Sequence, residues 1–314
     1  MPDIVTFGET MAVMVPTEKG ALRYAHSLRL RMAGAESNTA IAISKLGHSA
    51  GWVSALGNDP LGEYVLSSIR GEGVDVSSVK IDDKHRTGLM IKELGHRDTS
   101  VYYYRDGSAA SHFSENDLNL DYLKDARIIH LTGITPLLSN GCKMTCQTLL
   151  EYAKKNRKIL SFDPNIRLKL WGDKDFGEMI RAFTFNADIV FIGLDEAKFL
   201  FGTNDVSQIV ELLREKGVRY IAIKDGSRGA WCADRMETVH IPPEPCVSVD
   251  PIGAGDGFNG AFLCGVLEGR SLYECGKMGA IAGAMATETT GDVEGYPTEK
   301  QMSARLESKN KIYR

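Results

Sequence analysis

Strand-like and helix-like segments alternate along most of this chain of 314 residues, and the alternation restricts the possible folds more than any other feature. The first apolar run, Ile4 to Glu9, includes Gly8 near its end. The later strand-like runs are residues 51–57, 127–132, 158–162, 188–192 and 219–223. Strands that alternate with helices are typical of a mostly parallel sheet covered by helices on both faces. We therefore expect an α/β fold.

The alternation is interrupted between residues 86 and 107. Thr87 to Leu94 and Thr99 to Arg105 are consecutive strand-like runs, which predicts a β-hairpin. Because side chains alternate along a strand, Tyr103 and Arg105 share one face. Arginine binds carboxylates with two parallel hydrogen bonds, so this face is a candidate site for an acidic ligand. An exposed strand with ordinary aromatic packing is the alternative.

A glycine-rich segment, Val249 to Phe258, lies between the apolar run 247–249 and a helix-like run from Phe258 to Leu267. Glycine allows tight turns and close approach to a ligand, and a helix N-terminus offers unpaired N–H groups to an anion. Gly253, Ala254 and Gly255 are therefore candidates to hold a phosphate. Asp256 would repel that anion unless it faces a second substrate. We expect Asp256 to act as the base that prepares a hydroxyl group to attack the phosphate.

Two other interpretations of this segment remain open. It can be a plain strand-to-helix turn that uses glycine. Gly255 to Gly260 also matches the G-x-G-x-x-G pattern of dinucleotide-binding folds. That match lies late in the chain and carries a carboxylate where a pyrophosphate would bind. The P-loop pattern is absent.

Two further polar segments follow the same logic. A glycine turn at Ala33-Gly34 enters a helix that we expect to end near Gly47, where Gly34, Ala35, Ser37 and Asn38 are placed to contact a hydroxylated ligand or to cap the helix. Asp163-Pro-Asn165-Ile-Arg167 follows a strand-like run. Open α/β sheets bind ligands at the carboxyl ends of their strands, although a capped turn is the simpler possibility.

Composition and charge narrow the class of protein. Apolar residues make up 43% of the chain, enough for a large core, and the formal net charge of −4 gives no sign of a nucleic-acid or membrane surface. No apolar run is long enough to span a bilayer, and the N-terminus carries no basic leader, so we expect a cytoplasmic protein. The six cysteines are expected to be reduced, and His130 to be a packed strand residue.

Asp250-Pro-Ile-Gly-Ala-Gly-Asp256 resembles the C-terminal signature of the ribokinase-like (PfkB) carbohydrate kinases. In that family the equivalent aspartate is the catalytic base and the Gly-Ala-Gly backbone forms the anion hole. Pro251 replaces the usual threonine, as in the sugar-acid kinase branch. The resemblance covers nearly the whole chain. It implies one ribokinase-like domain over residues 1–314, with lid strands from about 12–33 and 86–107.

The resemblance also implies roles for individual residues. The expected sugar-binding residues are Gly34, Ala35, Ser37, Asn38, Tyr103, Arg105, Arg167 and Asp256. Arg167 would bridge a sugar acid and the transferred phosphate. The expected nucleotide-binding residues are Asn165, Lys224, Gly226, Arg228, Gly229, Gly253, Ala254 and Gly255. Glu196 is expected to organise Mg²⁺ through water, although Gly193 stands where the family usually has asparagine.

Within the family, the likeness is greatest to the kinases of 2-keto-3-deoxygluconate. It implies ATP-dependent phosphorylation of the 6-hydroxyl, with ATP and Mg²⁺ as cofactors and K⁺ as a further ion to test. The lid sheet implies a homo-oligomer. Phosphorylation of a neutral sugar, as in fructokinase or ribokinase, is the near alternative. A nicotinamide-dependent oxidoreductase and a catalytically silent sugar-binding regulator are the more distant ones.

Overall fold

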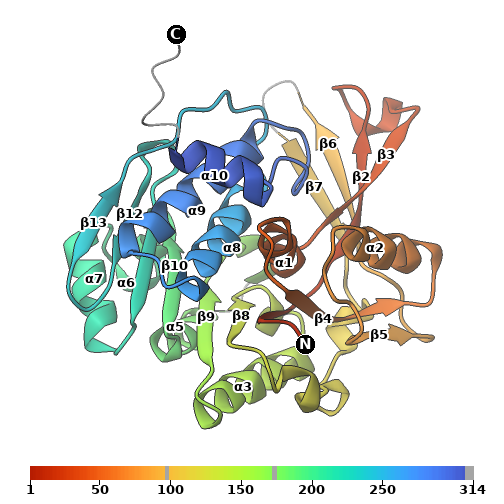
Figure 1. Cartoon of the computed structure of the whole chain (residues 1–314). Coiled ribbons are helices and arrows are strands. Elements are labelled where there is room, and N and C mark those ends of the chain that lie inside the picture. The colour runs from red at the N-terminus through yellow and green to blue at the C-terminus, as the bar shows by residue number, and fades with distance from the viewer. Residues whose placement is uncertain (96–98, 172–174, 308–314) are drawn as a thin grey trace.

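The computed structural model describes residues 1–95, 99–171 and 175–307, and a large twisted sheet forms its centre (Figure 1). Its strands are β1 (Ile4–Phe7), β4 (Ala50–Gly57), β5 (Val79–Asp82), β8 (Ile128–Thr132), β9 (Ile159–Asp163), β10 (Ile189–Gly193), β11 (Tyr220–Lys224), β12 (Ala230–Ala233) and β13 (Thr238–Ile241). Their order is β13-β12-β11-β10-β9-β8-β1-β4-β5. The pairs from β11 to β5 are parallel, and β12 and β13 are added antiparallel at one edge.

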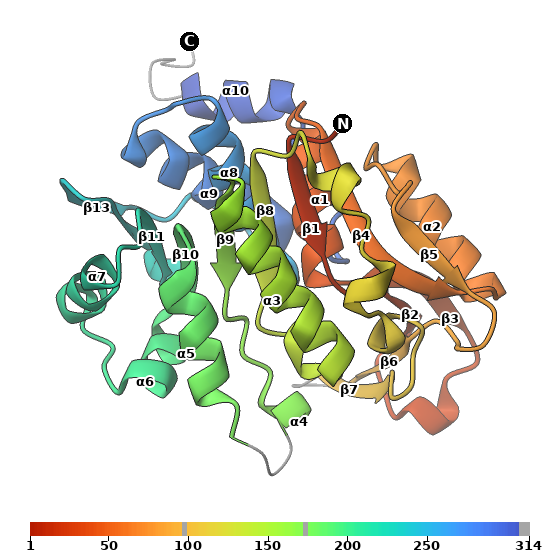
Figure 2. The ribbon, with the colours of Figure 1, turned by 90° about the horizontal axis from the view of Figure 1, so that it is seen from below.

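Helices cover both faces of this sheet, as Figures 1 and 2 show from two directions. One face packs against α1 (Ala35–Lys45), α2 (Pro60–Gly71), α8 (Ala254–Leu267), α9 (Leu272–Thr287) and α10 (Glu299–Glu307). The other packs against α3 (Asn140–Lys155), α4 (Leu168–Trp171), α5 (Gly177–Asn186), α6 (Leu194–Phe201) and α7 (Val206–Glu215). Alternation along β1 sends Ile4 into the first apolar layer and Val5 into the second. The expectation of a mostly parallel α/β fold is confirmed, and we call the large sheet with its helices the body.

A second, smaller sheet stands beside the large one (Figure 1). It contains β2 (Met11–Pro16), β3 (Leu28–Ala33), β6 (Leu89–Leu94) and β7 (Thr99–Tyr104), in the order β3-β2-β6-β7. We call these four strands the small sheet. Its apolar cluster, Met11, Val13, Ala33 and Met90, is separate from the two layers of the large sheet. Tyr102 and Tyr104 of β7 are exposed.

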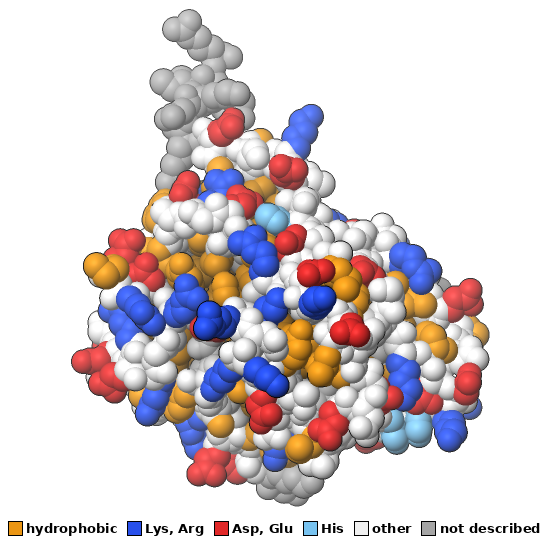
Figure 3. Space-filling view, turned by 60° about the horizontal axis from the view of Figure 1, so that its bottom comes forward, with side chains coloured by type: hydrophobic (Ala, Val, Ile, Leu, Met, Phe, Trp, Pro, Cys, Tyr) orange, Lys and Arg blue, Asp and Glu red, His pale blue; other side chains and the backbone are white. Residues whose placement is uncertain are grey.

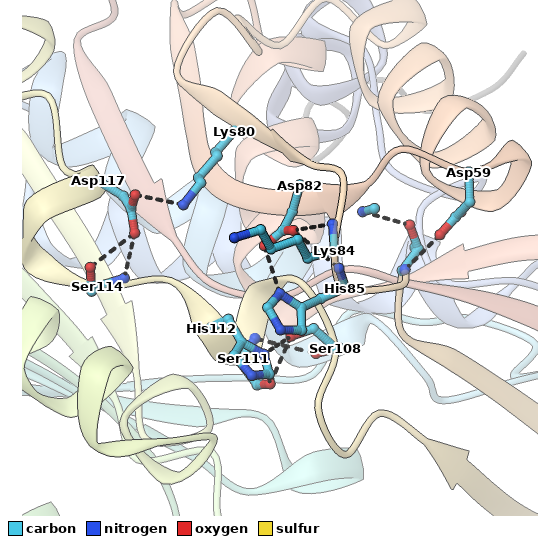
Figure 4. A network of polar contacts seen from close by, with 12 residues as sticks. Asp59, Lys80, Asp82, Lys84, His85, Ser108, Ser111, His112, Ser114 and Asp117 are labelled. Atoms are coloured by element: carbon cyan, nitrogen blue, oxygen red, sulfur yellow. Dashed lines mark hydrogen bonds and ion pairs between the residues drawn. The ribbon is translucent and has the colours of Figure 1, made fainter.

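The connections between the two sheets are held by polar contacts (Figure 4). Asp59 caps α2 and also accepts a hydrogen bond from the backbone amide of Thr87, just before β6, at 2.8 Å. Nearby, the rings of His85 and His112 stack with their centroids 3.5 Å apart. His85 Nδ1 lies 2.9 Å from Asp82 Oδ2. The chain entering the small sheet and the chain leaving it are therefore held against each other.

The glycine-rich segment differs from the sequence expectation. Helix α8 begins at Ala254, several residues before Phe258, and residues 247–249 form no strand. Gly253 is the cap residue, with a left-handed φ of 79°, and its carbonyl accepts a hydrogen bond from the Tyr296 hydroxyl at 2.8 Å. The expected phosphate loop is thus the cap and first turn of a helix. The helix starts early because glycine satisfies the left-handed cap.

The remaining expectations from composition concern cysteine, histidine and the membrane. All six cysteines are free thiols. His130 is buried in β8, with Nδ1 2.9 Å from the Ser161 hydroxyl. Of the helices that the structure describes, none combines the length and the apolar character needed to cross a bilayer.

Candidate active site

Two cavities meet at the start of α8. The first, about 440 Å³, lies between the small sheet, the start of α1 and the carboxyl ends of β9 and β11. The second, about 390 Å³, is mostly apolar and lies between α8, α9 and the turn after β11. We call them the polar cavity and the apolar cavity. Lys224, Pro251 and Gly255 line both. A group transferred between two ligands would have to pass this shared wall.

The cap of α8 requires glycine for two reasons. A Cβ atom at Gly253 would lie 2.0 Å from the carbonyl oxygen of Asp292, and the φ of 79° disfavours any other residue. The first intrahelical bond runs from the Gly257 amide to the Gly253 carbonyl at 2.9 Å. The amides of Gly255 and Asp256 precede that bond and lie in the first turn, where helix N–H groups have no intrahelical partner. This turn can therefore bind negative oxygen atoms.

Asp256 belongs to the same turn and lines the polar cavity. Its Oδ2 accepts a hydrogen bond from Asn38 Nδ2 at 2.9 Å. Burial, together with the nearby Asp163 carboxylate, raises the pKa of Asp256 to about 7, against the opposing effects of Asn38, Lys224 and Arg167. A carboxylate with a pKa near neutrality is suited to general base catalysis.

The start of α1 contributes some, but not all, of the expected residues. Gly34, Ala35 and Asn38 line the polar cavity. Ser37 does not. Its buried hydroxyl accepts a hydrogen bond from Thr10 at 2.7 Å and donates one to the Gly34 carbonyl at 3.1 Å. Ser37 therefore stabilises the turn before α1 and does not line the cavity, in contrast to its expected placement in contact with the sugar.

On the small-sheet side, Tyr103 and Arg105 line the polar cavity together, as their alternation predicts. The Arg105 guanidinium lies 5.9 Å from the centre of the Tyr103 ring. It also donates to the Glu9 carboxylate, 2.7 Å from Nε to Oε2, and the Ser108 hydroxyl holds the other oxygen at 2.5 Å. Both partners are buried. Arg105 is thus already paired with a carboxylate, which the sequence analysis did not anticipate.

Arg167 has a different environment. It lines the polar cavity from the turn after β9, its side chain is exposed, and its Nη1 donates to the neighbouring Ile166 carbonyl at 3.4 Å. Among the described residues, no carboxylate forms an ion pair with it. Arg167 is therefore the cavity arginine whose charge is available to a ligand.

The floor of the polar cavity is a network around Asp163. Its Oδ2 accepts hydrogen bonds from Lys224 Nζ at 2.7 Å and Asn259 Nδ2 at 2.6 Å. Its Oδ1 accepts the backbone amide of Asn165 at 3.0 Å, and Asn165 lines the cavity in a left-handed conformation. Burial alone would lower the pKa of Lys224, but the Asp163 and Glu196 carboxylates raise it. Lys224 is therefore a fixed cation where the two cavities meet.

Glu196 lines the polar cavity, although its oxygens already have partners. They accept the backbone amides of Ile166 at 2.7 Å and Gly193 at 2.8 Å, which caps α6. Burial and the Asp163 carboxylate raise the pKa of Glu196. Within the described ranges, no group of three or more His, Cys, Asp or Glu residues is arranged to hold a metal ion. A single carboxylate fits Mg²⁺ that keeps most of its waters and binds substrate phosphates.

The apolar cavity contains most of the expected nucleotide-binding positions. They are Lys224, Gly226, Gly229, Ala254 and Gly255, whereas Asn165 and Gly253 line the polar cavity. Gly283 and Ala284 of α9 also line the apolar cavity. Arg228 is an exception, because its exposed side chain pairs with Asp225 and does not line either cavity. A Cβ atom at Gly283 would lie 3.1 Å from the Ala254 carbonyl oxygen, so the small residue lets α9 approach α8.

Four charged residues of the polar cavity were not predicted from the sequence: Glu9, Glu36, Lys92 and Asp292. Glu36 is buried and accepts hydrogen bonds from the Thr132 and Thr135 hydroxyls, both at 2.6 Å. Lys92 could have been found, since hairpin pairing aligns it with Val101, on the face that carries Tyr103. No feature of the sequence around Asp292 indicates that it lines the cavity.

The structure does not support the dinucleotide-binding interpretation of the G-x-G-x-x-G match. Gly255 to Gly260 lie inside α8, and not in the turn between a strand and a helix that a dinucleotide fold requires.

The surface carries side chains of mixed character. On the face shown in Figure 3, basic, acidic and apolar side chains are interspersed.

Comparison with known proteins agrees with this geometry. Residues 1–299 match the model of the pfkB family carbohydrate kinases. The chain is 35% identical to 2-dehydro-3-deoxygluconokinase from Bacillus subtilis, over 99% of this chain and 97% of the relative. It is 30% identical to a probable fructokinase from Arabidopsis thaliana, over 96% of each chain.

Two crystal structures share the fold. A PfkB protein from Polaromonas has a TM-score of 0.88 and 33% identity, covering 97% of this chain and all of that one. An uncharacterized sugar kinase from Pyrococcus horikoshii in complex with ATP has a TM-score of 0.81 and 26% identity, covering 95% of this chain and 96% of that one. This chain therefore belongs to the pfkB family of carbohydrate kinases and has its ribokinase-like fold.

Proposed function

We propose that this kinase transfers the γ-phosphate of ATP to the 6-hydroxyl of 2-keto-3-deoxygluconate, with Asp256 as the base. One observation carries the proposal. Asp256, with a pKa of about 7, lies in the first turn of α8, where a polar cavity containing an available arginine meets an apolar cavity of a size suited to a nucleotide. The 35% identity to a 2-dehydro-3-deoxygluconokinase supports the choice of substrate.

In the proposed reaction, Asp256 accepts the proton of the sugar hydroxyl. The oxygen attacks the γ-phosphorus in line, and the bond from phosphorus to the bridging oxygen of ADP breaks. Amides of the first turn of α8 and the Lys224 ammonium stabilise the transferred charge. Bound Mg²⁺ supplies charge neutralisation at the ATP phosphates, and Glu196 and Asn165 are the residues that would hold its water shell.

The small sheet is proposed to act as a lid. Its Met90, Lys92, Val101 and Tyr103, with Arg105 just beyond β7, face the polar cavity. Closing this sheet over a bound sugar would exclude water, which otherwise competes with the hydroxyl for the phosphoryl group.

Recognition of the substrate's carboxylate is assigned mainly to Arg167. Arg105 is held by Glu9, whose other oxygen accepts the Ser108 hydroxyl, so Arg105 contributes its charge and positions Tyr103 without forming the full two-bond grip. Arg167 has no such competitor among the described residues. This division differs from the sequence expectation, in which both arginines bind the acid directly.

Phosphorylation of a neutral sugar is the second candidate. The buried Arg105–Glu9 pair favours it, because a cation that already has a carboxylate gains less from a second one. The likeness to a probable fructokinase points the same way. Under this alternative, Arg167 contacts only the phosphate.

A coupled assay of ADP release across keto-deoxy sugar acids and neutral sugars separates the two candidates. We expect the sugar acid to be preferred, and Arg167→Gln to reduce that preference, measured as the ratio of kcat/KM values, by roughly 10- to 100-fold, since hydrogen bonds to charged groups contribute about 1.5–3 kcal/mol. Lys169→Gln removes a neighbouring exposed cation as a control. Equal loss for acidic and neutral sugars in Arg167→Gln would favour the second candidate.

A further inference from the structure

A continuous series of polar contacts connects the small sheet to Asp256. Lys92 in β6 is 6% exposed, and its ammonium nitrogen lies 3.7 Å from Asp292 Oδ1. Asp292 is 7% exposed, and its Oδ2 lies 3.5 Å from Asn38 Nδ2. The same nitrogen donates to Asp256 Oδ2 at 2.9 Å. One amide group therefore serves two carboxylates, and one of them has a counter-ion that belongs to the small sheet.

Stability alone does not explain this arrangement. Desolvating a lysine and an aspartate costs several kcal/mol per ion, so a buried pair adds little to the free energy of unfolding unless its geometry is ideal. The contact between Lys92 and Asp292 is long, at 3.7 Å. The Oδ1 atom of Asn38 is also buried without a hydrogen-bond partner in the described part of the chain. The groups are therefore held in place at a cost, beside the proposed base.

We propose that Lys92 and Asp292 are positioning residues that control the ionisation of Asp256 through Asn38 and make it depend on the position of the small sheet. This inference rests on the proposed role of Asp256 as the base. With the small sheet in place, Lys92 neutralises Asp292, and Asn38 stabilises the ionised base. When the sheet moves away, Asp292 loses its counter-ion, so the two neighbouring carboxylates hold a proton more readily and Asp256 is ionised less easily.

The charges that act directly on the two carboxylates, apart from Lys92, belong to the body, although one of them is paired with Arg31 of β3 in the small sheet. Asp163, Lys224 and Arg167 act on Asp256. Asp250 and Glu294 act on Asp292, and Glu294 is itself paired with Arg31. The Tyr296 hydroxyl, on which both carboxylates act, is a further neighbour and donates to the Gly253 carbonyl.

Burial raises the pKa of Asp292, whereas Lys92 and Asn38 lower it. Lys92 is therefore the small-sheet charge in this set that directly opposes proton uptake by Asp292.

The test compares the pH dependence of kcat at saturating sugar and ATP in the wild type, Lys92→Met, Asp292→Asn and the double variant. Lys92→Met leaves Asp292 uncompensated, so the acidic limb of the pH profile should move to higher pH. Asp292→Asn removes a negative charge and leaves Lys92 unpaired, so the limb should move to lower pH. Each shift should be at least about half a pH unit for charges this close. The double variant should return toward the wild-type limb.

Three controls make the result decisive. Lys80→Met removes a lysine of the exposed Lys80–Asp117 pair and should leave the limb unchanged (Figure 4). Lys92→Arg keeps the charge and should keep the wild-type limb. Because either single neutralisation leaves a buried charge unpaired, the double variant provides the comparison if a single variant does not fold. Shifts in the same direction, or an unmoved limb in folded variants, would overturn the proposal.

A readout without turnover separates this inference from the proposed function. The ionisation of Asp256 also appears in the pH dependence of unfolding free energy, compared between each variant and the same variant carrying Asp256→Asn. If that comparison shows the opposite shifts but the wild type phosphorylates no sugar, only the proposed function fails. If the wild type is an active kinase and that comparison does not change, only the positioning role fails.

Discussion

At the scale of single residues, the proposed chemistry depends on the environment of Asp256. The residue is recognisable from its position after Gly253-Ala-Gly255, but its ionisation is set by groups distant in the sequence. Burial and Asp163 raise its pKa, while Asn38, Lys224 and Arg167 oppose them. This environment leads to one expectation for catalysis and one for pH dependence.

Replacing Asp256 with asparagine should remove the proposed base while keeping a side chain of nearly the same shape. We expect kcat to fall by roughly 10²- to 10⁴-fold, the contribution typical of a positioned base. The coupled assay measures the loss, and circular dichroism checks that the variant is folded. Turnover close to the wild-type value in a folded Asp256→Asn enzyme would contradict the assignment.

The pH dependence of the wild type should report the same group. With a pKa of about 7, Asp256 is protonated below neutrality, so kcat should rise between about pH 6 and pH 8. The pKa of Asp256 in the folded state lies above the ordinary value of 3.8, so ionisation of Asp256 lowers the free energy of unfolding. This loss is absent below about pH 4 and complete above about pH 7. Asp256→Asn should therefore gain stability relative to the wild type as the pH rises through that range. Thermal unfolding at pH 4, 6 and 8 measures this, and a constant difference would contradict it.

At the scale of elements, the start of α8 determines the site. The left-handed cap at Gly253 lets the helix begin at Ala254, which places Gly255 and Asp256 in its first turn. The carbonyl of Asp292 contacts the same glycine. The cap therefore also fixes the segment that contains Asp292 against the helix end.

Gly253→Ala should destabilise the protein more than a glycine substitution with the same backbone strain. Gly269 is the matched control, because its φ of 70° is similar to the 79° of Gly253, but a Cβ atom at Gly269 would meet nothing within 4 Å in the described part of the chain. Gly269→Ala should cost about 1–2 kcal/mol, the penalty of a left-handed alanine. Gly253→Ala should cost about 1–3 kcal/mol more, because its Cβ collides with backbone. Urea denaturation measures both, and equal losses would show that the collision is relieved at no cost.

At the scale of the whole molecule, the body and the small sheet are stabilised differently. The body contains two apolar layers that helices cover on both sides of the large sheet. The small sheet contains one small cluster of four buried apolar residues. Local opening needs less free energy where fewer apolar contacts are lost.

Hydrogen exchange should therefore distinguish the two sheets. Amides in β2 and β6, the inner strands of the small sheet, should exchange faster than amides in β8 to β10 of the body. A non-hydrolysable ATP analogue together with the sugar should slow exchange in the small sheet more than in the body, since closure adds contacts there. Mass spectrometry of peptides from both regions measures this. Equal protection before and after ligand addition would contradict a lid role.

Several features of the fold and site follow from local patterns. Alternation of strand-like and helix-like runs predicts the parallel sheet, and the hairpin after residue 86 predicts β6 and β7. The family signature identifies Asp256, and the wider resemblance identifies Arg105 and Arg167, although their roles stay predictions. The start of α8 was misplaced because glycine usually breaks helices, whereas here Gly255 and Gly257 lie in the first turn of one.

The sequence by itself determined the period of each element, the glycine that a left-handed cap requires, and the family to which the chain belongs. Only the tertiary structure decided that Arg105 pairs with the Glu9 carboxylate and that the Ser37 hydroxyl bonds within the protein instead of lining the cavity. It also decided that Lys92 and Asp292 lie together beside the proposed base. The reason is physical. Secondary structure follows from neighbours along the chain, whereas the state of a charge depends on burial and on every other charge within a few ångströms, whatever their distance in the sequence.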